Sequence, residues 1–175
     1  MRFARLLASL ALFGAGLAAG LRAASAKDET PPPAPSKAIS HPFADAFLGA
    51  WATELTAEGT KGAGHANVER GVGGTALVER YEGPGGAGPY HALAVYKFGA
   101  DGKSLACWWF DDLLDEPIVL SGGVTEKGFD LYGAVPDGSG KYHATLDKVE
   151  GGWSNKVYVD EKLVQSEEYR RPPAK

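Results

Sequence analysis

The 175-residue sequence contains one cysteine, one methionine and no excess of basic residues. A single cysteine excludes an intramolecular disulfide and a zinc site built from several cysteines. Acidic residues number 22 against 18 basic ones, which gives a formal net charge of −4. Proteins that bind DNA or RNA need clustered positive charge to contact phosphates, so this balance argues against nucleic acid as a partner.

The sequence has one long apolar run, and it lies at the start of the chain. Arg2 and Arg5 precede the run at residues 6–21, and the small residues Ala24-Ser25-Ala26 follow it. This order is typical of a secretory signal peptide cleaved after Ala26, and it predicts a periplasmic or secreted protein. The run is shorter than the roughly 20 residues of a membrane helix, and an uncleaved anchor is the alternative. Cleavage removes three arginines and no acid, so the net charge becomes −7.

Composition divides the chain into four parts. The signal peptide occupies residues 1–26. Residues 27–40 contain four prolines and are expected to form a stiff, extended linker. A globular domain follows at residues 41–171, and residues 172–175 form a short tail.

Glycine is abundant, and most glycines separate short segments rich in aromatic and β-branched residues. Ten such segments are predicted as strands, at residues 50–55, 64–70, 75–82, 90–98, 103–110, 117–121, 128–133, 141–149, 153–159 and 163–170. The connections are too short for parallel crossovers, so neighbouring strands pair antiparallel. The fold class is therefore all-β, an antiparallel up-and-down β-barrel of about ten strands. A short helical turn that begins at Pro42 precedes it and places Phe43 and Phe47 on one face.

Side-chain alternation predicts which residues face the barrel interior. A two-residue turn at Glu150-Gly151 gathers the apolar residues of the flanking strands on one face: Tyr142, Ala144, Leu146, Trp153, Val157 and Val159. A two-residue turn at Glu161-Lys162 carries the alternation into the last strand. It predicts that Glu168 and Arg170 point inward, while Gln165, Glu167 and Tyr169 point outward. A change of one residue in that turn would reverse these assignments.

The central predicted hairpin is apolar on both faces. An even-length loop around Asp101-Gly102 places Tyr96, Cys107 and Trp109 on one face, and Trp108 and Phe110 on the other. The outer face is therefore either covered by the linker or available as a partner surface.

Several short motifs resemble those of the lipocalins and their calycin relatives. Gly49-Ala50-Trp51, after a short helical turn, is similar to the Gly-x-Trp motif that opens the first strand in that family. The resemblance implies that an arginine from the last strand packs over the tryptophan, a role open to Arg170 or Arg171.

The chain also resembles a bacterial group within this architecture, the domain of unknown function numbered 1579, over roughly residues 43–171. The shared motifs lie at residues 47–51, 79–83, 89–90, 108–111 and 168–171. Because the predicted strands exceed the eight of lipocalins, a ten-stranded relative of the fatty-acid-binding and nitrobindin type fits equally well. The resemblance implies a barrel that holds a ligand.

Motifs for metal binding or covalent catalysis do not stand out. The histidines, His41, His65, His91 and His143, lack the spacing of zinc ligands. The nitrobindin resemblance implies haem held by a histidine near the end of the chain, but none follows His143, so no cofactor is expected. Cys107 lies among apolar neighbours and is expected to be a buried thiol that reacts slowly.

The leading hypothesis is an exported module that binds a small, largely apolar molecule inside the barrel. The predicted ligand-binding residues are Trp51, Tyr96, Trp109, Tyr142, Trp153, Glu168 and Arg170. Two alternatives stay open: an enzyme that acts on a hydrophobic substrate in the barrel, and a structural or interaction protein of the cell envelope, for example a homodimer. It also stays open whether the aromatic side chains leave a cavity or fill the barrel completely.

Overall fold

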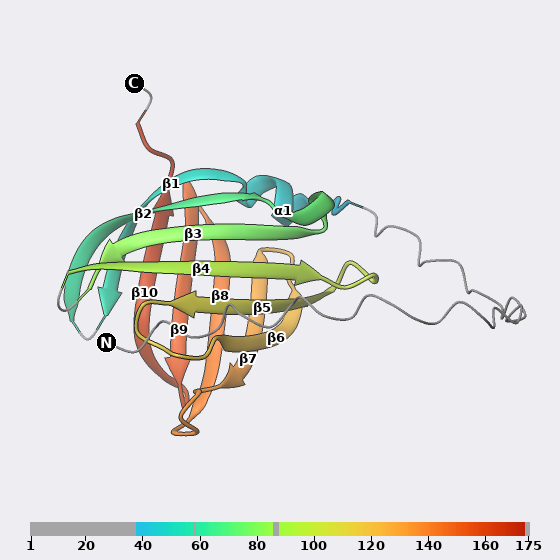
Figure 1. Ribbon diagram of the computed structural model, residues 1–175. Helices are drawn as coiled ribbons and strands as arrows, with labels where there is room; N and C mark the ends of the chain where they lie inside the picture. Colours follow the sequence, from blue (N-terminus) through green and yellow to red (C-terminus); the bar gives the residue numbers. More distant parts are fainter. Residues whose placement is uncertain (1–37, 58, 86–87, 174–175) are drawn as a thin grey trace, which may run out of the picture. The chain divides into compact units, whose positions relative to one another are not determined.

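The computed structural model describes residues 38–57, 59–85 and 88–173. The predicted signal peptide and nearly all of the predicted linker lie outside these residues. Ten antiparallel strands close into a barrel in the order β1-β10-β9-β8-β7-β6-β5-β4-β3-β2 (Figure 1). The strands are β1 (Gly49–Ala57), β2 (Thr60–Arg70), β3 (Ala76–Pro84), β4 (Pro89–Phe98), β5 (Ser104–Asp111), β6 (Ile118–Val124), β7 (Gly128–Ala134), β8 (Lys141–Val149), β9 (Gly152–Val159) and β10 (Lys162–Arg170). The predicted all-β barrel is confirmed.

One short helix, α1 (Pro42–Phe47), precedes β1 and confirms the predicted helical turn. Pro42 occupies the first turn, where the missing N–H costs no hydrogen bond, and His41 caps the helix by accepting from the amide of Phe43. A single turn of 3₁₀-helix, η1 (Val72–Gly74), lies between β2 and β3. Within the described residues, no helix has the length and apolar character needed to cross a membrane.

Helix α1 fills one end of the barrel with aromatic side chains. The ring centroids of Phe47 lie 6.2 Å from Trp51 and 5.5 Å from Trp153, and Phe43 also lies 5.5 Å from Trp153. These rings are buried and belong to the same hydrophobic cluster as the inward residues of the strands. This half of the barrel is therefore a packed core.

An arginine at the end of the chain covers the same end of the barrel. The guanidinium of Arg171 lies 3.6 Å from the ring centroid of Trp51 and donates to the carbonyl of Leu48 at 2.8 Å. The position implied by the lipocalin resemblance is thus taken by Arg171 and not by Arg170. Stacking on the indole and bonding to backbone carbonyls ties the chain after β10 to the start of β1.

The predicted β8–β9 hairpin is confirmed residue by residue. Ala144 pairs with Val157 and Leu146 pairs with Asn155, as expected for a two-residue turn at Glu150-Gly151. Gly151 has φ of 76°, a left-handed conformation that glycine adopts without steric cost. Alternation along the two strands then directs Ala144, Leu146 and Trp153 into the barrel, where all three are buried.

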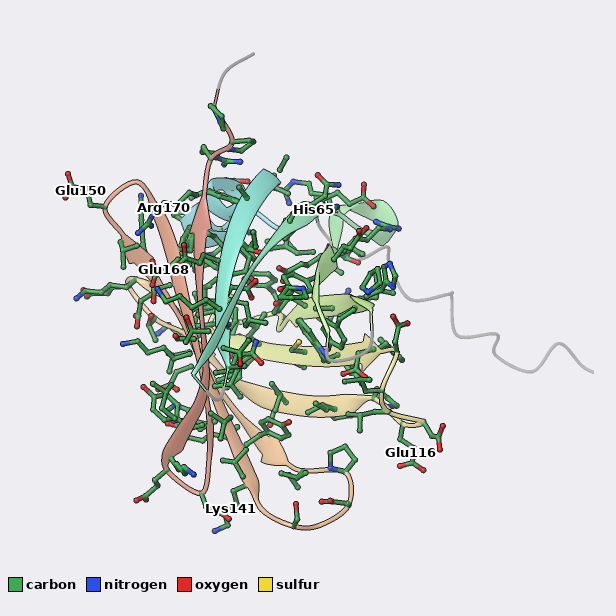
Figure 2. All side chains as sticks on the ribbon, turned by 90° about the vertical axis from the view of Figure 1, so that its left-hand side faces the viewer. His65, Glu116, Lys141, Glu150, Glu168 and Arg170 are labelled. Atoms are coloured by element: carbon green, nitrogen blue, oxygen red, sulfur yellow. The ribbon has the colours of Figure 1, made fainter. Side chains whose placement is uncertain are left out.

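The predicted inward direction of Glu168 and Arg170 is wrong. The turn comprises Asp160 and Glu161, and a β-bulge follows between Leu163 and Gln165, so that Val157 pairs with Gln165. A bulge adds one residue to one strand and reverses the facing of every later side chain. Glu168 and Arg170 therefore lie on the outer face of β10 (Figure 2), where their side chains are 42% and 48% exposed and form an ion pair.

The predicted outward direction of Glu167 and Tyr169 is wrong for the same reason. Glu167 and Tyr169, expected on the outside, are 2% exposed and lie inside the barrel. Moving the turn by one residue would have changed each pairing by two positions and kept the faces unchanged. The bulge alone therefore explains the exchange of faces.

The outer face of the central β4–β5 hairpin is apolar, as predicted. Trp108 pairs with Val95 on one side and with Val119 of β6 on the other. Phe110 is 44% exposed and Val119 is 51% exposed. The linker that the sequence offers as a cover lies outside the described residues.

Candidate ligand-binding cavity

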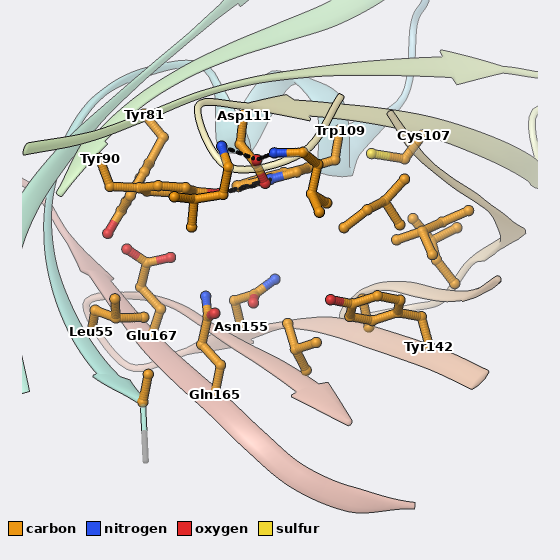
Figure 3. A pocket seen from close by; sticks show the side chains of 18 of the residues that line it. Leu55, Tyr81, Tyr90, Cys107, Trp109, Asp111, Tyr142, Asn155, Gln165 and Glu167 are labelled. Atoms are coloured by element: carbon orange, nitrogen blue, oxygen red, sulfur yellow. Dashed lines mark hydrogen bonds between the residues drawn. The ribbon is translucent and has the colours of Figure 1, made fainter. Parts of the chain in front are cut away.

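The half of the barrel away from α1 is hollow. It contains a cavity of about 660 Å³ (Figure 3), and residues at the β3–β4 turn (Pro84, Gly85) and of the β5–β6 loop (Leu113, Leu114) are part of its lining. This volume contradicts an interior filled completely by its own side chains. The lining is mainly apolar and aromatic, and it includes Leu55, Tyr81, Tyr90, Tyr96, Trp109, Leu114, Leu120, Leu131, Tyr142 and Val157. Its polar members include Asp111, Asn155, Gln165 and Glu167.

Three of the seven predicted ligand-binding residues line this cavity: Tyr96, Trp109 and Tyr142. Trp51 and Trp153 lie in the packed half beneath α1, where they contact Phe47. Glu168 and Arg170 lie outside the barrel. The structure therefore brings together the central aromatic residues of the prediction and separates them from its charged pair.

Glu167 lines the cavity, and a second buried carboxyl group, that of Glu79, lies close to it. Glu79 of β3 is 1% exposed and accepts a hydrogen bond of 2.7 Å from the hydroxyl of Tyr96. The hydroxyl of Tyr169 lies 3.0 Å from Glu79 Oε1 and 3.1 Å from Glu167 Oε2. A phenol has one hydrogen to donate, so both contacts become hydrogen bonds only when one carboxyl is protonated.

Burial raises the pKa of both carboxyl groups. Removal from water raises the pKa of Glu79 to about 7, hydrogen bonding from Tyr96 opposes the shift, and the nearby charge of Glu167 adds to it. Burial also raises the pKa of Glu167, while Thr53, Tyr81 and Tyr169 act in the opposite direction. Buried acids with raised pKa values are common at functional sites.

A group of buried polar atoms lacks hydrogen-bond partners at this place. In the described part of the chain, the three such atoms are Thr53 Oγ1, Tyr81 Oη and Glu167 Oε1. The hydroxyls of Thr53 and Tyr81 lie near enough to Glu167 to lower its pKa, yet neither completes a hydrogen bond to the free oxygen. Figure 3 shows the Tyr81 hydroxyl and the Glu167 carboxyl pointing toward each other across the cavity, with Gln165 and Asn155 beside them.

Glycines make room for this polar group. A Cβ atom on Gly83 would lie 2.2 Å from the Tyr81 hydroxyl oxygen, and one on Gly64 would lie 2.9 Å from Thr53 Oγ1. Both distances are too short for van der Waals contact, so the hydroxyls occupy their positions because the neighbouring residues have no side chain.

At the mouth of the cavity, Asp111 fixes the β5–β6 loop. Its Oδ2 accepts from the hydroxyl of Tyr90 at 2.9 Å and from the indole of Trp109 at 3.2 Å. Its Oδ1 accepts from the amides of Leu113 and Leu114 at 2.8 and 2.9 Å. The two leucines are exposed, line the cavity and form part of its rim.

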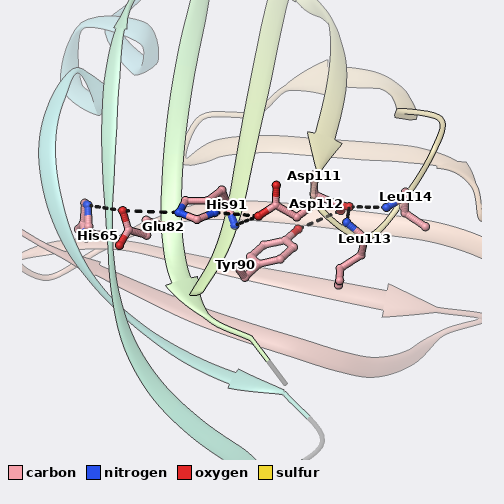
Figure 4. Close-up of polar contacts among 8 residues, drawn as sticks. All are labelled: His65, Glu82, Tyr90, His91, Asp111, Asp112, Leu113 and Leu114. Carbon is pink, nitrogen blue, oxygen red and sulfur yellow. Dashed lines mark hydrogen bonds and ion pairs between the residues drawn. The ribbon is translucent and has the colours of Figure 1, made fainter. Parts of the chain in front are cut away.

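His65 and His91 belong to a separate row of polar side chains on the outer surface (Figure 4). His65 Nε2 lies 3.6 Å from Glu82 Oε2, and His91 Nδ1 lies 2.8 Å from Asp112 Oδ2. All four side chains are exposed. Among the residues that the structure describes, no three His, Cys, Asp or Glu side chains are placed to hold a metal ion together.

Cys107 is buried, as predicted, and it lines the cavity. Burial raises the pKa of its thiol, with a further contribution from the nearby charge of Glu79. Both effects keep the sulfur protonated, which disfavours a role as a nucleophile.

Sequence reasoning missed the polar residues of the site. Tyr81 and Glu79 stand in the Glu79–Gly83 motif of the family resemblance, but nothing local marks them as inward. Asn155 could have been found, because the confirmed β8–β9 register places it on the inner face opposite Leu146. Glu167 and Tyr169 could not be found without the bulge in β10.

No protein-family model matches the chain, and no curated protein matches it. Among solved structures, a redesigned β-barrel is similar at 12% sequence identity with a TM-score of 0.42, over 75% of this chain and 96% of that one. The closed ten-stranded barrel is established by the strand pairing of the chain itself.

Proposed function

We propose that this protein is a binding module that holds a small, largely apolar molecule inside the barrel. The observation that carries the proposal is the cavity of about 660 Å³. Small-molecule sites commonly measure about 300–1,000 Å³ and combine apolar walls with a few polar groups that orient the ligand. Here Tyr142, Leu120 and Val157 contribute to the walls, and Glu167 and Gln165 supply polar groups.

We also propose a location and a relationship for this chain. The first is export to the periplasm or beyond, supported by the signal-like order of residues 1–26. The second is a relationship to the calycin-like bacterial group numbered 1579, supported by Gly49-Ala50-Trp51 and by the stacking of Arg171 on Trp51.

A cavity-filling substitution tests binding inside the barrel. Ala144 is buried and lines the cavity, so Ala144→Phe places a ring where the ligand would lie. The matched control is Ala52→Phe, because Ala52 is exposed on β1. The neutral fluorescent probe N-phenyl-1-naphthylamine is titrated into the purified proteins, and native mass spectrometry identifies any molecule that co-purifies.

We expect the probe to bind the unaltered chain and Ala52→Phe equally, and Ala144→Phe at least about tenfold more weakly, equivalent to about 1.4 kcal/mol. If circular dichroism shows that Ala144→Phe does not fold, Val157→Phe on the paired strand β9 replaces it. Equal binding by a folded cavity variant and the control would contradict the proposal, and so would absence of binding to the unaltered chain.

A further inference from the structure

The cavity has acidic groups and no basic ones. Among the described residues that line it, none is Lys, Arg or His, whereas Asp111 and Glu167 are present. Glu79 lies near Glu167, and both contact the hydroxyl of Tyr169. A negatively charged ligand would therefore meet repulsion and find no cation to bind.

The acids of the cavity also lack ion-pair partners. In the residues described, none of the ion pairs includes Glu79, Asp111 or Glu167. A buried charge without a counter-charge is costly, and proteins usually pair it or keep it protonated. The site thus lacks a positive charge to pair with its acids, and it also lacks hydrogen-bond partners for some of its polar atoms.

The unpartnered atoms match the donors of one chemical group. Glu167 Oε1 and the hydroxyl oxygens of Thr53 and Tyr81 lie close together; all three can accept a hydrogen bond, and the two hydroxyls can also donate one. A primary ammonium group has three N–H donors and no acceptor. Aromatic rings lie beside this place, with the Tyr81 centroid 6.0 Å from Tyr90 and 6.4 Å from Trp109. Aromatic rings attract cations over their faces and also provide apolar contact area.

We propose that the ligand is an organic amine, with an apolar skeleton in the hollow half of the barrel and its ammonium group bound to Glu167. The ammonium donates to Glu167 and Tyr81, which both line the cavity, and the skeleton lies against the aromatic and aliphatic walls. This inference rests on the proposed binding function and specifies the chemical class of the ligand.

Three probes with one skeleton test the class. Isothermal titration calorimetry at pH 8 compares 4-phenylbutylamine, 4-phenylbutanol and 4-phenylbutyrate, which are cationic, neutral and anionic. We expect the amine to bind at least about tenfold more tightly than the alcohol, because hydrogen bonds to charged groups are the stronger ones, and the carboxylate to bind weakest. Equal or tighter binding of the alcohol or the carboxylate would overturn the inference.

Two adjacent substitutions test the residue. Glu167→Gln keeps the side-chain volume and removes the charge inside the barrel, whereas Glu168→Gln removes the same charge on the outer face. We expect Glu167→Gln to weaken the amine at least about tenfold and to change the alcohol less than threefold, and Glu168→Gln to change neither. An equal loss of amine affinity in the two variants would show that only the net charge of the protein matters, and would contradict binding at Glu167.

The pH dependence supplies a second readout. The groups that face Glu167 are Glu79, Tyr81 and Tyr169, and Tyr96 faces Glu79. Burial raises the pKa of Glu167, so protonation of its carboxyl group competes with the ammonium as the pH falls, and we expect weaker amine binding at pH 6 than at pH 8. The alkyl amine itself stays protonated over this range. A flat profile for the amine would contradict its pairing with these carboxyl groups.

These outcomes separate the inference from the binding function on which it rests. If N-phenyl-1-naphthylamine binds in the cavity but the amine has no advantage, the amine inference fails and the binding function stands. If the neutral probe does not bind either, the binding function itself fails. The probe series uses the unaltered chain, so it decides the question even if Glu167→Gln does not fold.

Discussion

At the scale of single residues, Glu79 is one of the two acids that the described part of the chain buries inside the barrel. Its carboxyl is 1% exposed, receives the Tyr96 hydroxyl and lies against the hydroxyl of Tyr169. An acid in such surroundings favours the neutral form, because no water stabilises its charge. Folding therefore changes the affinity of Glu79 for a proton.

This environment makes stability depend on pH in a defined direction. The pKa of Glu79 is about 7 in the folded protein, against 4.5 as its ordinary value. The folded state binds the proton more tightly, so this contribution is complete below pH 4.5 and is lost as the pH rises through 7. We expect the free energy of unfolding to fall between pH 5 and pH 8, and Glu79→Gln to reduce that fall by up to about 3 kcal/mol.

Urea unfolding at the two pH values measures the effect. Glu126→Gln in the exposed β6–β7 turn is the control for loss of one acidic residue. The same pH slope in Glu79→Gln as in the unaltered chain would show that another group is responsible. Glu167, whose pKa is also raised by burial, would be the next residue to test.

At the scale of elements, the six-residue helix α1 decides which half of the barrel is solid. A helix this short has little stability of its own and depends on packing. Phe43 and Phe47 supply that packing by inserting into the end of the barrel, against Trp51, Trp153 and Phe129. The helix therefore closes one end, and ligand access is left to the other.

Removing one ring from α1 tests this role. Phe47 is fully buried among Trp51, Tyr96, Trp153 and Tyr169, so Phe47→Ala leaves a void and is expected to lower the free energy of unfolding by about 3–5 kcal/mol. Leu163→Ala is the control, because Leu163 is exposed and should change stability by less than about 0.5 kcal/mol. Chemical denaturation measures both. Similar small losses would mean that α1 only lies against the barrel and does not fill it.

At the scale of the whole molecule, a closed sheet divides into a packed half and a hollow half. Closure pairs β1 with β10 and leaves no free strand edge in the barrel. The rim of the hollow half is set by turns and by the β5–β6 loop that Asp111 fixes. The ligand site is thus a property of the complete barrel, since its polar lining residues come from strands that include β3, β5, β9 and β10.

The proposed export makes a prediction for the entire chain. We expect expression of the full sequence in a bacterial host to yield a protein that lacks residues 1–26, because small residues at 24 and 26 suit signal peptidase. Ala26→Trp should block this cleavage, while Ser25→Ala should not. Intact mass of the purified protein measures processing. Retention of residues 1–26 in the unaltered chain would contradict a cleaved signal.

The sequence alone determined the elements whose signals are local. Glycine and Asp-Gly turns marked the strand limits, and Pro42 with Phe43 and Phe47 marked α1. Alternation predicted the β8–β9 pairing of Ala144 with Val157 because a two-residue turn fixes the register of a hairpin. These features depend on residues close to one another in the chain.

Only the tertiary structure decided what the cavity contains. The bulge after Leu163 turned Glu167 inward and Glu168 outward, although nothing in the local sequence distinguishes the two. Barrel closure then brought Glu167 against Thr53 and Tyr81, and Tyr169 against Glu79, residues that are 90 positions apart. Strand register and burial are set by pairing across the whole sheet, so the acidic character of the site follows from the barrel and not from any segment of the sequence.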